Sequence, residues 1–132
     1  MTDSLPATPF AEGAKCSTQY GAICWRMHRG KVEVLLITSR DTGRWVIPKG
    51  WPMTGRSPAE AAAREAWEEA GVEGKVSDMG LGRFSYAKVY SAKRAIACDV
   101  EVFGLRVAKL VNDFPERKQR RRKWFAAEKA AR

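Results

Sequence analysis

Residues 48–72, PKGWPMTGRSPAEAAAREAWEEAGV, decide the fold, because they carry the clearest start and stop signals for a helix in the chain. Ser57, Pro58 and Glu60 match a capping box with proline at the first helical position. Gly71 stands where a helix usually ends, since glycine readily adopts the left-handed backbone conformation found there. We therefore predict one helix between Ser57 and Gly71, and we assign Glu60 to capping rather than to chemistry.

Three carboxylates, Glu65, Glu68 and Glu69, lie close together on this helix. At ~100° per residue, with Arg64 set at zero, Glu68 falls at about 40°, Glu65 at about 100° and Glu69 at about 140°. Alanines and Trp67 fill the arc from about 200° to 300°, which we expect to pack on a sheet. Like charges at i, i+4 destabilise a helix by about 0.2–0.5 kcal/mol per pair, and the helix dipole disfavours acids in the later turns.

Two interpretations of the acidic cluster are open. The simpler one is a solvated acidic face, which is common. The other is a metal site, because clustered carboxylate oxygens are the ligands that Mg²⁺ and Mn²⁺ prefer, and these ions usually serve phosphate chemistry. Ala61, at about 60° on the same wheel, leaves room beside the acids. A bound ion would also remove their repulsion, so we favour the metal site.

The rest of the composition indicates one domain in a reducing compartment. With 132 residues, 45% of them hydrophobic, the chain is long enough for one packed core. Its three cysteines suit neither a disulfide framework nor a zinc site, which makes a cytoplasmic setting the default expectation. The amino terminus has no signal-peptide pattern and no window could span a membrane. We expect a flexible segment over residues 1–17 and a single domain over 18–132.

Residues on both sides of the helix have strand-like patterns, so the fold class is α/β or α+β. A hairpin turn is expected at His28, Arg29 and Gly30, the simplest role for the chain's one histidine. A short helix is expected at the end, over residues 124–131. The predicted strands cover residues 19–27, 31–38, 45–47, 75–77, 81–90 and 95–107.

Positive charge is concentrated near the end of the sequence. The net charge is +9, and residues 112–132 hold eight Lys/Arg against three Asp/Glu. Such a field favours a polyanionic partner, but nucleic acid, acidic lipid and a multiply phosphorylated small molecule all satisfy it. Charge alone leaves these three open.

Gly50 together with residues 64–72, REAWEEAGV, resembles the signature box of the Nudix hydrolases. That pattern is a Gly, five residues, a Glu, seven residues, and then Arg-Glu-apolar-x-Glu-Glu-x-Gly-apolar. Every position matches except the first Glu, which falls on Arg56. The resemblance implies a Nudix fold, a mixed β-sheet sandwiched between α-helices, with the acids of the box presented at a cleft.

Further residues are similar to the diphosphoinositol polyphosphate phosphohydrolase branch of the family, which also cleaves diadenosine polyphosphates. These are AICWR at 22–26, Ser39-Arg40 with Arg44-Trp45, and RRRKWF at 120–125 followed by Glu128. Where the branch has a glycine-rich loop, this sequence has Trp51 and Pro52 after Gly50. The resemblance implies a small polyphosphorylated substrate and no membrane partner.

The resemblance also assigns roles to individual residues. Glu65 and Glu69 would ligate Mg²⁺, or Mn²⁺ in its place, together with the carbonyl oxygen of Gly50. Glu68 would accept a proton from the attacking water or bind a further ion, and Arg64 would hold the acids in position. The residues expected to bind the substrate are Ser39, Arg40, Trp51, Lys93, Arg94, Arg121, Arg122 and Lys123.

The leading hypothesis is therefore a Mg²⁺-dependent pyrophosphohydrolase that cleaves phosphoanhydride bonds in diphosphoinositol polyphosphates or diadenosine polyphosphates. A second enzyme reading is hydrolysis of other nucleoside diphosphate derivatives, such as nucleotide sugars, or of RNA 5′ ends. The alternative from another class is an inactive Nudix module that binds RNA or another polyanion. Arg56 leaves some room for that alternative, whereas the retained Glu65, Glu68 and Glu69 argue against it.

Overall fold

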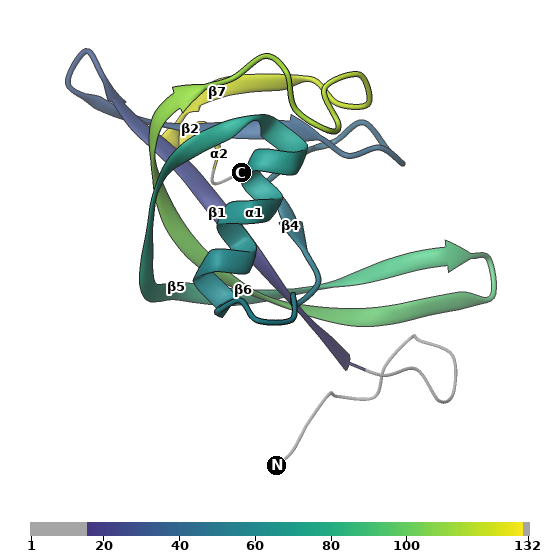
Figure 1. Cartoon of the computed structure of the whole chain (residues 1–132). Helices are drawn as coiled ribbons and strands as arrows, with labels where there is room; N and C mark the ends of the chain where they lie inside the picture. The colour runs from purple at the N-terminus through teal and green to yellow at the C-terminus, as the bar shows by residue number, and fades with distance from the viewer. Residues whose placement is uncertain (1–15, 131–132) are drawn as a thin grey trace.

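The computed structural model describes residues 16–130, which form one mixed sheet and two helices (Figure 1). Their order along the chain is β1 (Cys16–His28), β2 (Lys31–Thr38), β3 (Trp45–Val46), β4 (Lys49–Gly50), α1 (Pro58–Ala70), β5 (Val72–Ser91), β6 (Arg94–Leu110), β7 (Arg122–Ala126) and α2 (Ala127–Ala130). Most of the segment expected to be flexible, and the last two residues, lie outside this range. The described part begins inside β1, at Cys16.

The sheet divides at β1, and this division creates the space for a site. The main strand order is β3-β2-β1-β6-β5, with β1 and β6 parallel. The second half of β1, from Cys24, pairs with β2, whereas Tyr20 and Gly21 pair with β4 instead. Both β2 and β4 pair with β1, but at different parts of it. Residues 39–44, which follow β2, line a pocket at this division.

The hairpin between β1 and β2 is confirmed. Arg29 and Gly30 have φ angles of 52° and 77°, as the tight two-residue turn of a hairpin requires. His28 is the last residue of β1, opposite Lys31, and is exposed. The predicted strand over 31–38 coincides with β2.

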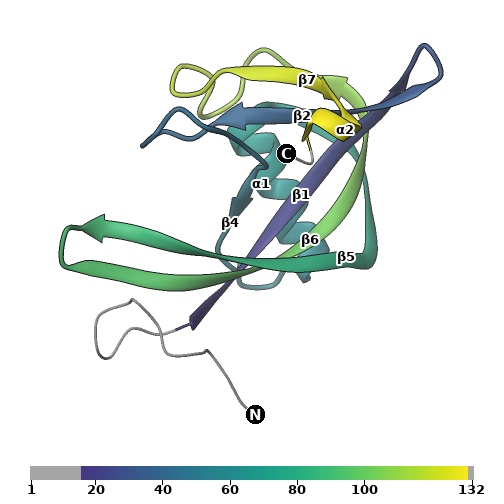
Figure 2. The ribbon, with the colours of Figure 1, turned by 180° about the vertical axis from the view of Figure 1, so that it is seen from behind.

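The strands predicted after the helix are longer than expected. Residues 75–77 and 81–90 belong to one strand, β5, whose pairing with β6 shifts register at several points, including between Val76 and Gly80. The far ends of β5 and β6 form a two-stranded arm that extends away from the rest of the sheet, as both views show (Figures 1 and 2). The arm is joined at its tip by Ala92 and Lys93.

Helix α1 begins and ends as predicted, but the buried face only partly coincides with the predicted one. The Ser57 side chain accepts from the Glu60 amide, the Glu60 side chain accepts from the Ser57 amide, and Gly71 has a φ of 67°. The buried residues are Ala59, Ala61, Ala62, Ala66, Glu69 and Ala70. The buried arc is thus rotated towards the acids, so that Trp67 lies at its edge and Ala61 is enclosed.

The predicted helix over 124–131 is largely wrong. Trp124 and Phe125 lie in β7, where they pair with Leu35 and Val34 of β2, and the helix covers only Ala127–Ala130. Helix propensity is overridden here because β2 offers a free edge and the Trp124 side chain packs against the core. Helices α1 and α2 lie on opposite sides of the sheet near β2 (Figures 1 and 2), which confirms the expected fold class. No helix within residues 16–130 is long and apolar enough to cross a membrane.

The end of α1 is fixed by Gly71 and Arg122. The Arg122 guanidinium donates to the carbonyl oxygens of Ala70 and Val111, at 2.7 and 2.8 Å, and so places a cation at the negative end of the helix dipole. A Cβ atom on Gly71 would lie 2.5 Å from Phe114 and 2.6 Å from the Val111 carbonyl oxygen. Both the conformation and the space at this position therefore require glycine.

We expect Gly71→Ala to lower the free energy of unfolding by about 3 kcal/mol, because strained backbone and overpacking add. Gly43→Ala is the matched control: Gly43 also has a positive φ, 72°, but a Cβ atom there meets nothing within 4 Å. Its loss should be about 1–2 kcal/mol, from the backbone alone. Urea unfolding of both variants measures this, and equal losses would contradict the packing argument.

Candidate functional site

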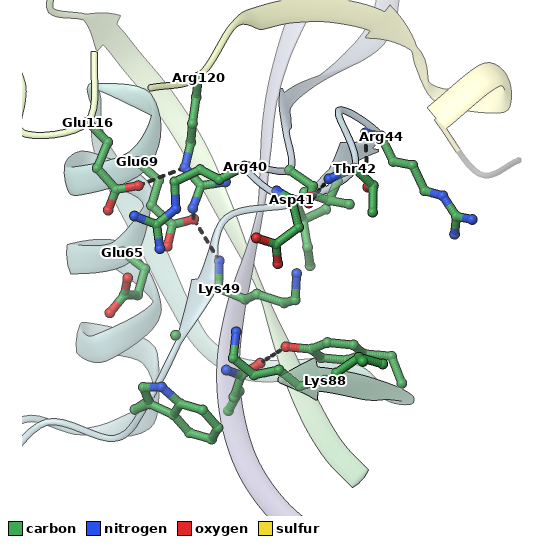
Figure 3. A pocket seen from close by; sticks show the side chains of 18 of the residues that line it. Arg40, Asp41, Thr42, Arg44, Lys49, Glu65, Glu69, Lys88, Glu116 and Arg120 are labelled. Carbon is green, nitrogen blue, oxygen red and sulfur yellow. Dashed lines mark hydrogen bonds and ion pairs between the residues drawn. The ribbon is translucent and has the colours of Figure 1, made fainter. Parts of the chain in front are cut away.

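A pocket of about 640 Å³ opens where β2 and β4 separate (Figure 3). One wall is α1, another is the loop of residues 39–44 after β2, and a third is the start of the β5–β6 arm with β1 beneath it. Glu116 and Arg120, from the loop before β7, complete the lining. The pocket thus brings together six separate segments of the chain.

Glu65 and Gly50 meet where α1 lies against β4. A Cβ atom on Gly50 would lie 2.2–2.6 Å from the three terminal atoms of the Glu65 carboxylate, so this carboxylate occupies the space that another residue would fill. Glycine lets the carboxylate lie against the backbone, and a larger residue here would displace the end of the Glu65 side chain. The backbone of Gly50 and the Glu65 carboxylate are therefore held against each other in the pocket.

Glu69 is the most enclosed of the acids, with 6% of its surface exposed. Its Oε1 accepts from the Lys49 amide at 3.3 Å and lies 3.9 Å from Arg120 Nη2. Burial, opposed by the nearby Arg120 and aided by a hydrogen bond with Glu65, raises its pKa to about 8. The pKa of Glu65 is also raised, mainly by burial. At neutral pH and without a metal ion, the pair therefore shares a retained proton.

Arg64 and Glu68 lie on the adjoining side of α1. Arg64 Nε donates to Glu68 Oε2 at 2.8 Å, and the carbon of its guanidinium lies 4.4 Å from the centroid of the Trp67 ring. Neither side chain is in the pocket lining. The expected contact of Arg64 with the acids is therefore observed with Glu68.

Cations line the pocket beside the acids. Arg120 is held by Glu116, whose Oε1 accepts from its Nε at 2.7 Å, and by the carbonyl oxygen of Thr38 at 3.0 Å. Arg40 donates to Gln119 at 3.0 Å. Figure 3 shows Arg40 and Arg120 next to Glu69. The pocket cations are Arg40, Arg44, Lys49, Lys88 and Arg120.

Six of the residues predicted from the sequence line the pocket: Ser39, Arg40, Gly50, Trp51, Glu65 and Glu69. The others lie elsewhere. Lys93 and Arg94 are at the tip of the arm, Arg121 and Lys123 stand beside the rings of Trp45 and Phe125, and Arg122 binds the end of α1. The local sequence predicts Arg122 as a phosphate ligand, but its guanidinium donates hydrogen bonds to backbone carbonyl oxygens instead.

Sequence reasoning missed several pocket residues. Arg120 and Arg44 belong to motifs that the family resemblance had included, and Lys49 precedes Gly50, so these had a local signal. Gln19, Tyr86, Lys88 and Glu116 had none, because β-strand pairing and the loop before β7 bring them in from distant segments. Glu116 is bound to α1 through its backbone amide, which donates to the carbonyl oxygen of Glu68 at 3.0 Å.

The residues present fit a divalent metal ion. The carboxylates of Glu65 and Glu69 and the carbonyl of Gly50 offer oxygen atoms, as Mg²⁺ and Mn²⁺ prefer, and the missing Cβ atom of Gly50 lets the Glu65 carboxylate lie against its backbone. Between residues 16 and 130, no three His, Cys, Asp or Glu side chains already stand in a metal-holding arrangement. A metal ion bound here would therefore have two carboxylates and backbone as its protein ligands. Cys24 and Cys98 are both buried.

Comparison with known proteins identifies the family. The fold is a mixed sheet with a helix whose paired glutamates lie next to a glycine of the sheet. The family model described as NUDIX domain matches residues 17–132. The chain belongs to the Nudix family. Over 103 residues it is 36% identical to Nudix hydrolase 12, mitochondrial, from Arabidopsis thaliana, covering 76% of this chain and 51% of that protein.

A second relative is diphosphoinositol polyphosphate phosphohydrolase 3-alpha from Mus musculus, 34% identical over 110 residues, which cover 82% of this chain and 63% of the relative. The chain thus spans 51–63% of the length of these curated relatives. The crystal structure of a C. elegans Ap4A hydrolase binary complex superposes with a TM-score of 0.60 at 23% identity, covering 86% of this chain and 82% of that one. This last similarity shows a shared fold.

We expect Glu69→Gln to stabilise the metal-free protein at high pH. The ordinary pKa of 4.5 is raised to about 8 in the folded state, so the unfolded chain loses this proton first as pH rises. Folding stability therefore falls between about pH 4.5 and 8, on the order of 1.4 kcal/mol per unit of pKa displacement. Glutamine removes that loss, so the variant should match the wild type at pH 4 and exceed it at pH 8–9.

Thermal unfolding in EDTA across this pH range measures the effect. Glu128→Gln, which removes an exposed carboxylate outside the pocket, is the control and should follow the wild type at every pH. A stability difference for Glu69→Gln that does not change with pH would show that folding does not raise the pKa of Glu69.

Proposed function

We propose that this protein is a Mg²⁺-dependent pyrophosphohydrolase that cleaves phosphoanhydride bonds. The observation that carries the proposal is that one pocket holds Glu65, Glu69 and Gly50 together with a group of cations. Paired carboxylates alone would serve many metals, and cations alone would serve any anion. Together they suit a substrate that is both anionic and cleaved with metal assistance.

The chain's residues have distinct tasks in this proposal. Glu65, Glu69 and the Gly50 carbonyl would hold the ion, which when bound neutralises phosphate charge and activates water. Release of the proton shared by Glu65 and Glu69 prepares them for the cation. Glu68 accepts the proton of the attacking water, and Arg64 orients Glu68 through the bond already present. Arg40 and Arg120 bind phosphate oxygens, for which a guanidinium has paired donors.

Diphosphoinositol polyphosphates are our first choice of substrate and diadenosine polyphosphates the second. The relatives of known substrate include proteins named diphosphoinositol polyphosphate phosphohydrolase 3, and five cations around one pocket suit a densely phosphorylated ligand. Trp51, which lines the pocket with 39% of its surface exposed, could stack on a nucleobase and favours the second. We retain a cytoplasmic setting as an expectation, although relatives include proteins named mitochondrial and chloroplastic.

We expect Glu69→Gln and Glu65→Gln to lower kcat by about 100-fold or more, because each removes a charge that holds the ion. Glu68→Gln should also lower kcat, with little change in KM. Glu73→Gln is the matched control, since Glu73 is an exposed acid just after α1, outside the pocket. The measurement is product formation with Mg²⁺ from a diphosphoinositol polyphosphate and from diadenosine hexaphosphate.

Turnover of either substrate by the wild type and its loss in the Glu69 variant would support the enzyme and identify its branch. Full activity in both Glu65→Gln and Glu69→Gln would show that the assignment of metal ligands is wrong. Binding of RNA without any turnover, weakening steeply with salt, would instead support the inactive Nudix module.

A further inference from the structure

Gln19 is a polar side chain buried in the floor of the pocket. It lies on β1, has 3% of its surface exposed, and lines the pocket together with Tyr86 of β5. The Tyr86 hydroxyl donates to Gln19 Oε1 at 2.6 Å. A carboxamide oxygen accepts and its nitrogen only donates. The oxygen accepts this hydrogen bond, and the amide nitrogen contributes two N–H donors.

Two lysines flank this pair. Lys49 Nζ stands 4.9 Å from the centre of the Tyr86 ring, so one face of that ring is covered by an ammonium group. Lys88 follows Tyr86 by two positions on β5, which places both side chains on the same face of the strand, and it also lines the pocket. Tyr86 is therefore engaged at its hydroxyl and at a ring face, and it serves to hold Gln19 and Lys49 rather than to stack on a base.

This wall of the pocket, formed by Gln19, Lys49 and Lys88 and called the donor wall below, presents far more hydrogen-bond donors than acceptors. Each ammonium group has three donors and no acceptor, and the Gln19 oxygen already accepts one hydrogen bond. Nucleobase edges and sugar hydroxyls carry donors as well as acceptors, so a donor wall satisfies them only in part. An ionised phosphate oxygen is an acceptor only and gains charge-assisted bonds from all three side chains.

We infer that the donor wall binds a phosphate group of the substrate other than the one held at Glu65 and Glu69. The inference rests on the proposed function and specifies it, because it requires a substrate with phosphates on more than one side of the pocket. Neutral or singly phosphorylated groups would leave the two lysines without a partner in the complex. The donor wall thus selects for polyphosphorylated ligands independently of the metal ion.

Binding of tripolyphosphate to the metal-free protein, measured by calorimetry in EDTA, tests the donor wall without turnover. Lys88→Met and Gln19→Met keep the length of each side chain and remove its donors. We expect each to weaken binding by about 10-fold, since each removes a charge-assisted hydrogen bond. Lys93→Met is the matched control, because it removes the same charge five residues away at the tip of the arm, outside the pocket.

Tyr86→Phe separates a donor role of Gln19 from a structural one. This variant removes the hydroxyl that orients the amide but keeps the amide nitrogen, so it should weaken binding less than Gln19→Met. Equal losses in these two variants, or an equal loss in Lys93→Met and Lys88→Met, would overturn the inference. A thermal melt of each variant establishes that it is folded, and Lys88→Met, altered on the pocket surface, decides the matter if Gln19→Met does not fold.

Kinetics with Mg²⁺ distinguish the two sources of the phosphate. The donor wall should act on KM, so Lys88→Met should raise KM about 10-fold with kcat changed less than threefold. A loss confined to the diphosphoinositol substrate would place a ring phosphate at the donor wall, and a loss with both substrates would place a chain phosphate there. If the wild type hydrolyses neither substrate while the tripolyphosphate differences remain, the proposed function fails and the donor wall stands.

Discussion

Close packing of α1 on the sheet brings the Glu65 carboxylate against the Gly50 backbone, and the pocket depends on this packing. The carboxylate occupies the volume of a missing Cβ atom. Such an approach is possible because the face of α1 towards the sheet consists of alanines, of which Ala61, Ala62 and Ala66 are completely buried. A larger residue at any of these positions would lift the helix and separate the acids from β4. The small side chains of α1 and the glycine in β4 thus both contribute to the close packing of the helix on the sheet.

The same close packing explains the charge pattern. Carboxylates withdrawn from water are costly unless they are paired, protonated or bound to metal. In this pocket Arg120 supplies a partial pairing to Glu69, at 3.9 Å, and the retained proton supplies the rest. The chain therefore keeps its acids in a state that a divalent cation relieves. In the proposed function, the surrounding basic residues bind the phosphate groups of the substrate. Much of the net charge of +9 lies outside this pocket.

Local sequence was sufficient for the parts of the fold that depend on local contacts. The capping box at Ser57, the glycine stop at Gly71 and the β1–β2 turn each depend on residues within one turn of one another. The angular order of the acids on α1 was also predictable, but not the face that meets the sheet, since a helical wheel gives relative angles only. Trp124 was assigned to a helix because its neighbours favour one, whereas pairing with Leu35 of β2, far away in the sequence, decides its conformation.

The site divides along the same line. The signature box contains Glu65, Glu69 and Gly50 at a known spacing, so the sequence alone predicts these residues. The wall that holds Gln19 could not be predicted in this way, because the parallel pairing of β1 with β6 brings Gln19 opposite Val100, and the pairing of β5 with β6 then places Tyr86 beside it. Arg122 shows the converse: a basic run predicts a phosphate ligand, yet its guanidinium donates to the carbonyl oxygen of Ala70 at the end of α1, 52 positions away in the sequence.

Arg56 shows how the pocket differs from the family pattern. It stands where the signature box has its first glutamate, is exposed, and lies outside the pocket lining. A carboxylate near Glu65 and Glu69 is nevertheless present, because Glu116 of the loop before β7 lies close enough to raise the pKa of both. Glu116 is bound to Arg120, so it enters the pocket together with its own counter-charge. The substitution at Arg56 therefore removes an acid from the box while the pocket keeps a third acid, whose charge is balanced by an arginine four residues further along the chain.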